Sequence, residues 1–189
     1  MKKQKTKEPA TVNSVRTGFK SFYLQTFVFL FMLLLTQQSF AQFRVVGYLP
    51  TWGGNLNDVQ YKKLTHINYA FMLPTASGGY QPMDETRLRN LVTLAHANNV
   101  KVIISVGGGG GGDAFKTIVP NAGLRTTFCN NMLNFCNQFN VDGVDVDWEF
   151  PNNGTEANNF GLLMQELSAK MHSNGKLCTI AVIAYGGTS

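Results

Sequence analysis

Four acidic side chains crowd the segment 142–149, which reads Asp-Gly-Val-Asp-Val-Asp-Trp-Glu. Side chains along a β-strand point alternately to opposite faces, so three of the acids share one face and apolar side chains occupy the other. The three acids that share a face are Asp145, Asp147 and Glu149. Carboxylates that face a protein interior require a partner, a proton or a ligand, because uncompensated burial of charge is costly.

The sequence offers these acids no nearby cation. Arg125 is the nearest basic residue before the segment, and the twenty residues after Glu149 contain neither Lys nor Arg. Repulsion and desolvation should therefore raise the pKa of at least one carboxyl group and make the acids share protons. A carboxylic acid that stays protonated near neutral pH can act as a general acid. The segment therefore predicts acid catalysis, with Glu149 last along the strand.

Two other interpretations of the acids are a divalent-metal site and an edge strand with solvated carboxylates. Alternate positions on a straight strand lie about 6.6–7 Å apart, and all three acids come from one element. This arrangement favours a linear proton relay over a metal cage, so we expect no metal and no other cofactor. Asp142 has the opposite parity and is interpreted as a structural residue at the beginning of the strand.

The elements that must position the acids show two alternating hydrophobic periodicities. Short β-rich segments are predicted at 44–49, 65–72, 100–106, 141–148 and 177–184. Between the last four of them, apolar side chains recur every three or four residues, which indicates amphipathic helices, and Asp84 is placed to cap the first. The connection 55–64 is shorter and its pattern is weaker. Strands that alternate with helices predict a parallel sheet with right-handed crossovers.

Two α/β folds fit this order, a doubly wound sheet and a (β/α)8 barrel. The glycine run 107–112 matches a dinucleotide-binding pattern, but such a fold also needs an acid about 20 residues later, and residues 114–141 contain none. The run is then a turn at a strand end, or a loop that lets a ligand approach the backbone. A complete barrel takes about 250 residues. If the chain is a TIM barrel, we expect it to be truncated after about five βα units.

The acidic segment matches the D-G-x-D-x-D-W-E signature of family 18 glycoside hydrolases, the chitinase family, at every fixed position. Residues 105–108 match the S-x-G-G motif of that family, and residues 44–52 and 67–71 look like its first two strands. The resemblance implies a barrel that cleaves β-1,4-linked N-acetylglucosamine polymers with retention, by a substrate-assisted mechanism.

The same resemblance assigns roles to the three acids. Glu149 would protonate the glycosidic oxygen, while the acetamido carbonyl of the sugar attacks its own anomeric carbon. Asp147 would accept a hydrogen bond from the acetamido N–H, and Asp145 would share a proton with Asp147.

Further substrate-binding residues are implied by position: Tyr48, Phe71, Gly107, Gly108 and Trp52. Tyr48 and Phe71 would line the sugar site at the cleavage point, although core packing explains both equally well. The two glycines would let the sugar approach the third strand, and Trp52 would stack on a sugar ring or cap the barrel. Gly109 and Phe150 depart from the Trp and Tyr that many chitinases carry there.

The N-terminus is predicted to be a signal peptide, residues 1–41. A basic stretch precedes a short apolar core at 22–35, and Ser39 and Ala41 are small residues before a cleavage point at Gln42. We expect secretion, to the periplasm or the extracellular space, with no stable membrane anchor after cleavage, although an uncleaved signal anchor is the alternative. From residue 42 onward 10 basic and 10 acidic residues balance, so nucleic-acid binding is not expected.

Three functions remain open for residues 42–189, a partial barrel of this family. The first is a secreted chitinase whose partner is chitin or a chitooligosaccharide. The second is an endo-β-N-acetylglucosaminidase acting on glycoproteins, and the third is a non-catalytic chitin-binding lectin of the same fold. The Met-x-Tyr-Asp motif of the family has no counterpart here, so we expect the N-terminal part of a longer enzyme. The three cysteines lie in apolar stretches and are expected to be buried thiols.

Overall fold

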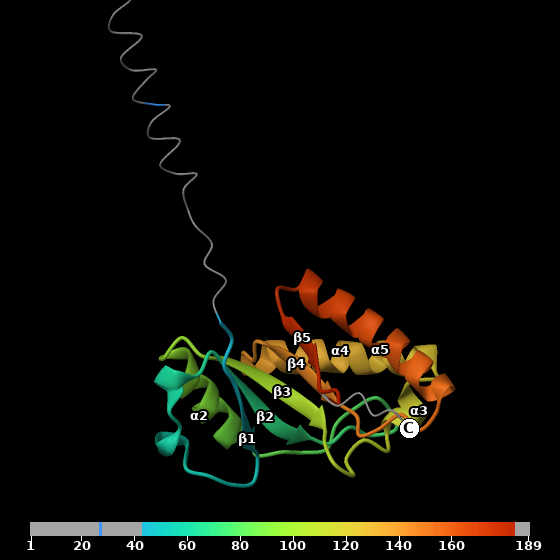
Figure 1. Cartoon of the computed structure of the whole chain (residues 1–189), viewed down its shortest axis with the longest axis horizontal. Coiled ribbons are helices and arrows are strands. Elements are labelled where there is room, and N and C mark those ends of the chain that lie inside the picture. Colours follow the sequence, from blue (N-terminus) through green and yellow to red (C-terminus); the bar gives the residue numbers. More distant parts are fainter. Residues whose placement is uncertain (1–26, 28–42, 184–189) are drawn as a thin grey trace, which may run out of the picture. The chain divides into compact units, whose positions relative to one another are not determined.

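The structure, a computed structural model, describes Phe27 and residues 43–183. A compact unit begins at Arg44, and all the strands described below belong to it (Figure 1). The predicted signal peptide falls almost entirely outside the described residues and stays a prediction. None of the helices in the described part of the chain combines the length and apolar character that a bilayer crossing requires.

Five parallel strands form one sheet in the order of the sequence, β1-β2-β3-β4-β5. Their bounds are Val46–Pro50, His66–Met72, Lys101–Gly107, Gly143–Asp147 and Leu177–Ile180. A doubly wound sheet reverses its strand order at a switch point, whereas a barrel adds each strand beside the preceding one. The observed order is that of a barrel, as the sequence predicted. β5 ends earlier than the predicted strand 177–184, whose last residue lies outside the description.

The helices begin at residues that cap them. α2 spans Glu85–His96, α4 spans Ala122–Phe139 and α5 spans Gly154–Ser173. Their N-caps are Asp84, Asn121 and Asn153, and each side chain accepts a hydrogen bond from a backbone N–H of the first turn. The weak connection after β1 contains two short 3-10 turns, η1 at Leu56–Asp58 and η2 at Tyr61–Lys63. A further one-turn helix, α3 at Phe115–Ile118, was not predicted.

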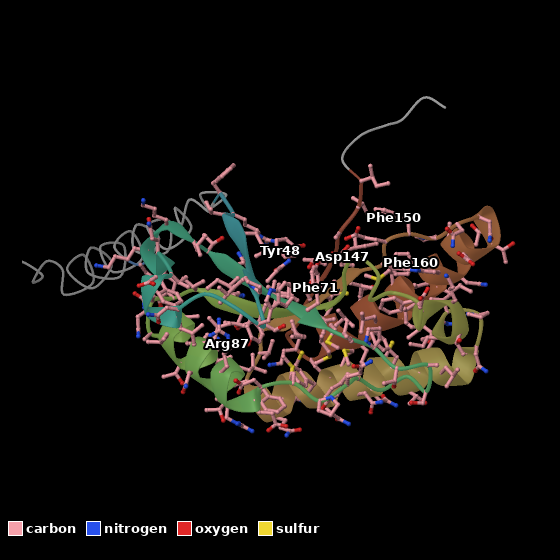
Figure 2. All side chains as sticks on the ribbon, turned by 90° about the horizontal axis from the view of Figure 1, so that it is seen from below. Tyr48, Phe71, Arg87, Asp147, Phe150 and Phe160 are labelled. Carbon is pink, nitrogen blue, oxygen red and sulfur yellow. The ribbon has the colours of Figure 1, made fainter. Side chains whose placement is uncertain are left out.

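The hydrophobic core lies between the sheet and its helices, which cover one side of the sheet (Figure 2). β3 and β4 direct five fully buried side chains to that side, namely Val102, Ile104, Val106, Val144 and Val146. Trp148 continues this face and packs edge to face against Phe160 of α5, with ring centroids 5.3 Å apart. Because the apolar positions of β4 face the helices, the acidic positions between them face the opposite side of the sheet.

The cysteines are free thiols in this core, as expected. Cys129 and Cys136 are buried in α4, and Cys178 is half-buried in β5. Burial raises the pKa of the first two to about 12 and of Cys178 to about 11, so all three stay protonated near neutral pH. They therefore act as small apolar side chains.

Candidate active site

The three acids of β4 form a graded ladder along the open side of the sheet. Asp145 is 2% exposed and Asp147 is 8% exposed, whereas Glu149 lies just beyond the strand and is exposed. The burial of Asp145 and Asp147 agrees with the predicted alternation, and Glu149 follows them at the carboxyl end of the strand. Figure 2 shows Asp147 close to Tyr48 and Phe71 on this side. The ladder brings two buried carboxyl groups behind one that a ligand can reach.

Asp145 accepts hydrogen bonds from hydroxyl groups on three other strands. Its Oδ2 accepts hydrogen bonds from Ser105 Oγ at 2.8 Å and from Tyr48 Oη at 3.1 Å. Its Oδ1 accepts one from Thr179 Oγ1 at 2.7 Å. Ser105 and Thr179 are the register partners of Asp145 on β3 and β5, so their side chains project beside it. Both oxygens of this buried carboxyl are thus satisfied by neutral donors.

Asp147 occupies the middle of the ladder, where charge is least favourable. Burial raises the pKa of Asp147 above its ordinary value, and the negative charges of Glu149 and Asp145 raise it further. The sequence predicted a raised pKa in at least one carboxyl for these two reasons. A proton shared within the ladder is favoured at this position.

The nearest candidate cations are engaged elsewhere. Arg125, the basic residue closest in sequence before the segment, donates from Nε to Glu166 Oε1 at 2.8 Å and from Nη1 to the Val119 carbonyl at 2.8 Å. Lys116 lines the same small hollow as Glu149 but pairs with Asp113 at 2.8 Å. Arg44 lines the same hollow as Asp145, but among the described residues no ion pair joins a guanidinium group to Asp145 or Asp147.

Close packing and backbone conformation require glycine at two positions of the run after β3. Gly107 has a φ of +113° and Gly108 one of +83°, both in the left-handed region. A β-carbon at Gly107 would overlap the carbonyl oxygen of Asp147, and one at Gly108 would lie 2.6 Å from the ring of Phe71. Gly108 N–H donates to the Asp147 carbonyl at 2.8 Å. These glycines hold the backbone of the ladder, and their predicted role in sugar approach stays a prediction.

The predicted aromatic residues gather only in part. The rings of Tyr48 and Phe71 lie 6.5 Å apart beside the acids, and Tyr48 is 53% exposed. Trp52 is 77% exposed and lines a separate hollow, which it shares with Phe71 and the loop before α2. Phe150 is 48% exposed and lines the hollow of Glu149. Trp52 therefore shares a hollow with Phe71, but that hollow is not lined by the three acids.

Asp142 lies at the opposite end of β4 and joins three elements there. Its Oδ2 accepts the backbone N–H of Val102 at 2.8 Å and lies 2.7 Å from His96 Nε2. His96 is the last residue of α2, so the contact ties that helix to the starts of β3 and β4. This geometry agrees with the structural role predicted for Asp142.

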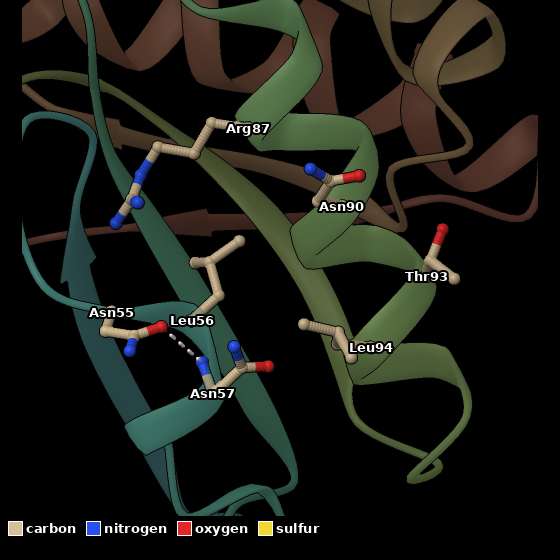
Figure 3. Close-up of a pocket in the computed structure, with 7 residues that line it drawn as sticks. All are labelled: Asn55, Leu56, Asn57, Arg87, Asn90, Thr93 and Leu94. Carbon is tan, nitrogen blue, oxygen red and sulfur yellow. Dashed lines mark hydrogen bonds between the residues drawn. The ribbon is translucent and has the colours of Figure 1, made fainter.

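Other hollows do not contain the ladder. The one in Figure 3 lies between η1 and α2 and is lined mainly by amide and aliphatic side chains, among them Asn55, Leu56 and Asn90. Arg87, at its edge, donates from Nη2 to the carbonyls of Gly53 and Gly54 and so anchors the loop after Trp52. Within the described part of the chain, no group of three or more His, Cys, Asp or Glu side chains is arranged to hold a metal ion.

Comparison with known proteins identifies the family of this fold and site. The sequence profile of glycosyl hydrolases family 18 matches residues 44–188. The chain therefore belongs to this family, and its five βα units are part of the family's (β/α)8 barrel. Catalytic domain 2 of the Group II chitinase from Ostrinia furnacalis has a TM-score of 0.70 and 26% identity, over 76% of this chain and 44% of that chain.

Curated relatives include chitinases and chitinase-like proteins. A chitinase-like effector from Moniliophthora roreri is 35% identical over 110 residues, which covers 56% of this chain and 27% of that protein. Chitinase A1 from Niallia circulans is 26% identical over 203 residues, covering 74% of this chain and 29% of that protein. The chain thus spans less than a third of the length of these two relatives.

Proposed function

We propose that the protein is a secreted chitinase, with residues 1–41 as its signal peptide and residues 42–189 as part of its catalytic barrel. The carrying observation is the graded acid ladder, in which Asp145 and Asp147 are buried and Glu149 is exposed. The names of the relatives support chitin as the substrate class. A solved structure of the Group IV chitinase from Ostrinia furnacalis holds allosamidin, and it shares 27% identity and a TM-score of 0.68 with this chain.

The proposed reaction divides the work among the three acids. Glu149 gives its proton to the glycosidic oxygen as the bond to the anomeric carbon breaks. The acetamido carbonyl oxygen of the same sugar bonds to that carbon and forms an oxazolinium ion. Asp147 accepts the acetamido N–H and stabilises the positive charge. Water then attacks the anomeric carbon from the face that the leaving group occupied. The bond from that carbon to the acetamido oxygen breaks, and the Glu149 carboxylate takes a proton from the water. The product keeps the original anomeric configuration.

The exposure of Glu149 fits this role because a general acid must reach the leaving oxygen. The burial of Asp145 fits a supporting role behind it. Tyr48 and Phe71 stand beside the ladder and offer aromatic surface to a sugar ring. The same residues are the proposed substrate contacts, together with Gly107, Gly108 and, further out, Trp52.

Replacement of one acid tests the assignment in the full-length protein. We expect Glu149→Gln to lower kcat on an N-acetylglucosamine oligomer by about 10²–10⁴-fold, the usual contribution of a general acid. Glu85→Gln makes the same chemical change on the exposed face of α2 and should leave kcat unchanged. Proton NMR of the first product should show the β-anomer. Wild-type turnover in Glu149→Gln contradicts the assignment.

A binding protein of the same fold is the second candidate, because one relative is described only as a chitinase-like effector. The presence of Glu149 in this chain favours catalysis. If the wild-type protein binds a chitooligosaccharide but does not cleave it, the binding function is correct. Faster release of glycans from a glycoprotein than cleavage of chitin decides for an endo-β-N-acetylglucosaminidase.

A further inference from the structure

The two carboxyl oxygens of Asp145 accept different numbers of hydrogen bonds. Oδ2 accepts from two hydroxyl groups, those of Ser105 and Tyr48, whereas Thr179 is the one donor recorded for Oδ1 among the described residues. The Thr179 hydrogen bond is also the shortest of the three, at 2.7 Å. Loss of Ser105 would leave Oδ2 with a second donor, but loss of Thr179 would leave a buried oxygen with none.

Thr179 is well suited to hold a carboxylate still. It lies on β5 directly opposite Asp145 in the register of the sheet. Its branched β-carbon restricts the side chain to few rotamers, so its hydroxyl is aimed at Asp145 without much loss of freedom. A strand position can therefore position an acid 34 residues away in sequence.

The three hydroxyl donors fix the plane of the Asp145 carboxyl group beside Asp147. Asp147 itself is buried between two other acids. A change in the position of Asp145 therefore changes the electrostatic environment of Asp147, whose pKa the charge of Asp145 helps to raise.

We propose that Thr179 is a positioning residue of the acid ladder, whose hydroxyl fixes the orientation of Asp145 beside Asp147. This inference rests on the proposed function for its effect on turnover. Its effect on the acids themselves does not depend on that function.

Asp145 and Thr179 line a hollow on the open side of the sheet, and other titratable groups line it with them. Tyr48 of β1 and Cys178 of β5 stay neutral in the acidic range, because burial raises the pKa of each. His66 of β2 is different, since an imidazole can titrate in that range and burial lowers its pKa further. Arg44 and His172 complete the charged lining. The test therefore needs a background in which His66 cannot titrate.

The experiment compares Thr179→Val with Thr179→Ser in the full-length protein. For Thr179→Val we expect kcat on an N-acetylglucosamine oligomer to fall about tenfold or more, with KM within about twofold, because one hydrogen bond to a charged group is lost. The acidic limb of the kcat profile should also shift, because a displaced Asp145 acts differently on Asp147, whose pKa it helps to raise. Thr179→Ser should restore both values.

Two matched variants sharpen the result. Ser105→Ala should shift the acidic limb less than Thr179→Val, because Tyr48 still donates to Oδ2; an equal or larger shift overturns the special role of Oδ1. A shift caused by Thr179→Val that persists in the His66→Gln background supports the inference. A shift that disappears there overturns it.

A second readout works without turnover. Carbon-13 NMR of labelled aspartate carboxyl groups should show the titration of Asp147 displaced in Thr179→Val and restored in Thr179→Ser, because the charge of Asp145 contributes to its raised pKa. Unchanged titrations in a folded Thr179→Val protein overturn the inference whatever the activity. Changed titrations in a protein that does not cleave chitin support it, and reject only the proposed function.

Discussion

A single carboxyl group, Asp147, shows how the site works against the stability of the fold. It is 8% exposed, and the charges that act on it are those of Glu149 and Asp145, both acids. An Asp whose pKa is raised on folding destabilises the native state above its ordinary pKa, because the unfolded chain ionises it more easily. Functional sites commonly carry such a cost.

Asp147→Asn should therefore stabilise the protein at neutral pH. The gain should be present at pH 7, shrink as the pH falls through the raised pKa, and vanish near pH 3, where Asp147 is protonated in both states. A rise in Tm of roughly 2–4 °C at pH 7, from thermal unfolding followed by circular dichroism, is the expected size. Chitin-oligomer cleavage should fall at the same time.

Asp113→Asn is the matched control for this prediction. Asp113 is exposed, and its hydrogen bond with Lys116 lowers its pKa. A lowered pKa contributes stability above the ordinary value, which is lost as the pH falls, so this variant should show no gain at pH 7. A Tm of Asp147→Asn at or below that of the wild type at pH 7 contradicts the interpretation.

The elements were predictable where burial imposes a period. The five strands and three long helices follow from alternation and from apolar residues spaced by three and four, because each faces one shared core. α3 was missed because four residues, Phe115–Ile118, are too few to show a helical period. The length of β5 was overestimated, since an apolar run does not reveal where pairing stops.

The acids were predictable for the same reason, and their partners were not. Alternation within one strand gives the shared face of Asp145, Asp147 and Glu149 directly. The hydroxyl groups of Thr179 and Ser105 reach Asp145 from strands 34 and 40 residues away in sequence. Their convergence depends on the register between strands, which the periodicity of a single strand does not encode. The sequence did hold one signal for Thr179: alternation along β5 places its side chain on the same face of the sheet as that of Asp145.

Two glycines allow the role of an element to be tested. Gly161 lies exposed inside α5, and a β-carbon there meets no atom within 4 Å. Gly161→Ala should raise the free energy of unfolding by about 0.5–1 kcal/mol, because alanine loses less conformational freedom in a helix. Gly107→Ala should lower it by about 2 kcal/mol or more, since the added carbon meets the Asp147 carbonyl at a φ of +113°.

Urea unfolding measures both effects as shifts in the midpoint at constant slope. If Gly107→Ala is as stable as the wild type, the turn after β3 is not fixed by its contact with β4. If Gly161→Ala is less stable, the middle of α5 is not a regular exposed helix.

At the scale of the whole molecule, the sheet is unequally supported. Among the described residues, β2, β3 and β4 each pair with two neighbours, whereas β1 and β5 each pair with one. β5 is also the shortest strand, with four residues. Backbone N–H groups of edge strands exchange with solvent through local openings of low free energy. Those of central strands exchange only through openings whose free energy approaches that of global unfolding.

Amide hydrogen exchange of the 189-residue chain should follow this order. We expect the slowest exchange in β3, close to the rate set by global unfolding. Exchange in β1 and β5 should be faster, tenfold for each ~1.4 kcal/mol by which their free energy of opening is lower. A closed (β/α)8 barrel pairs every strand on both sides. A longer form of the protein that supplies the remaining βα units should therefore slow exchange in β1 and β5 to the level of β3. Exchange in β5 that is already as slow as in β3 in the 189-residue chain would show that its edge is protected by other means.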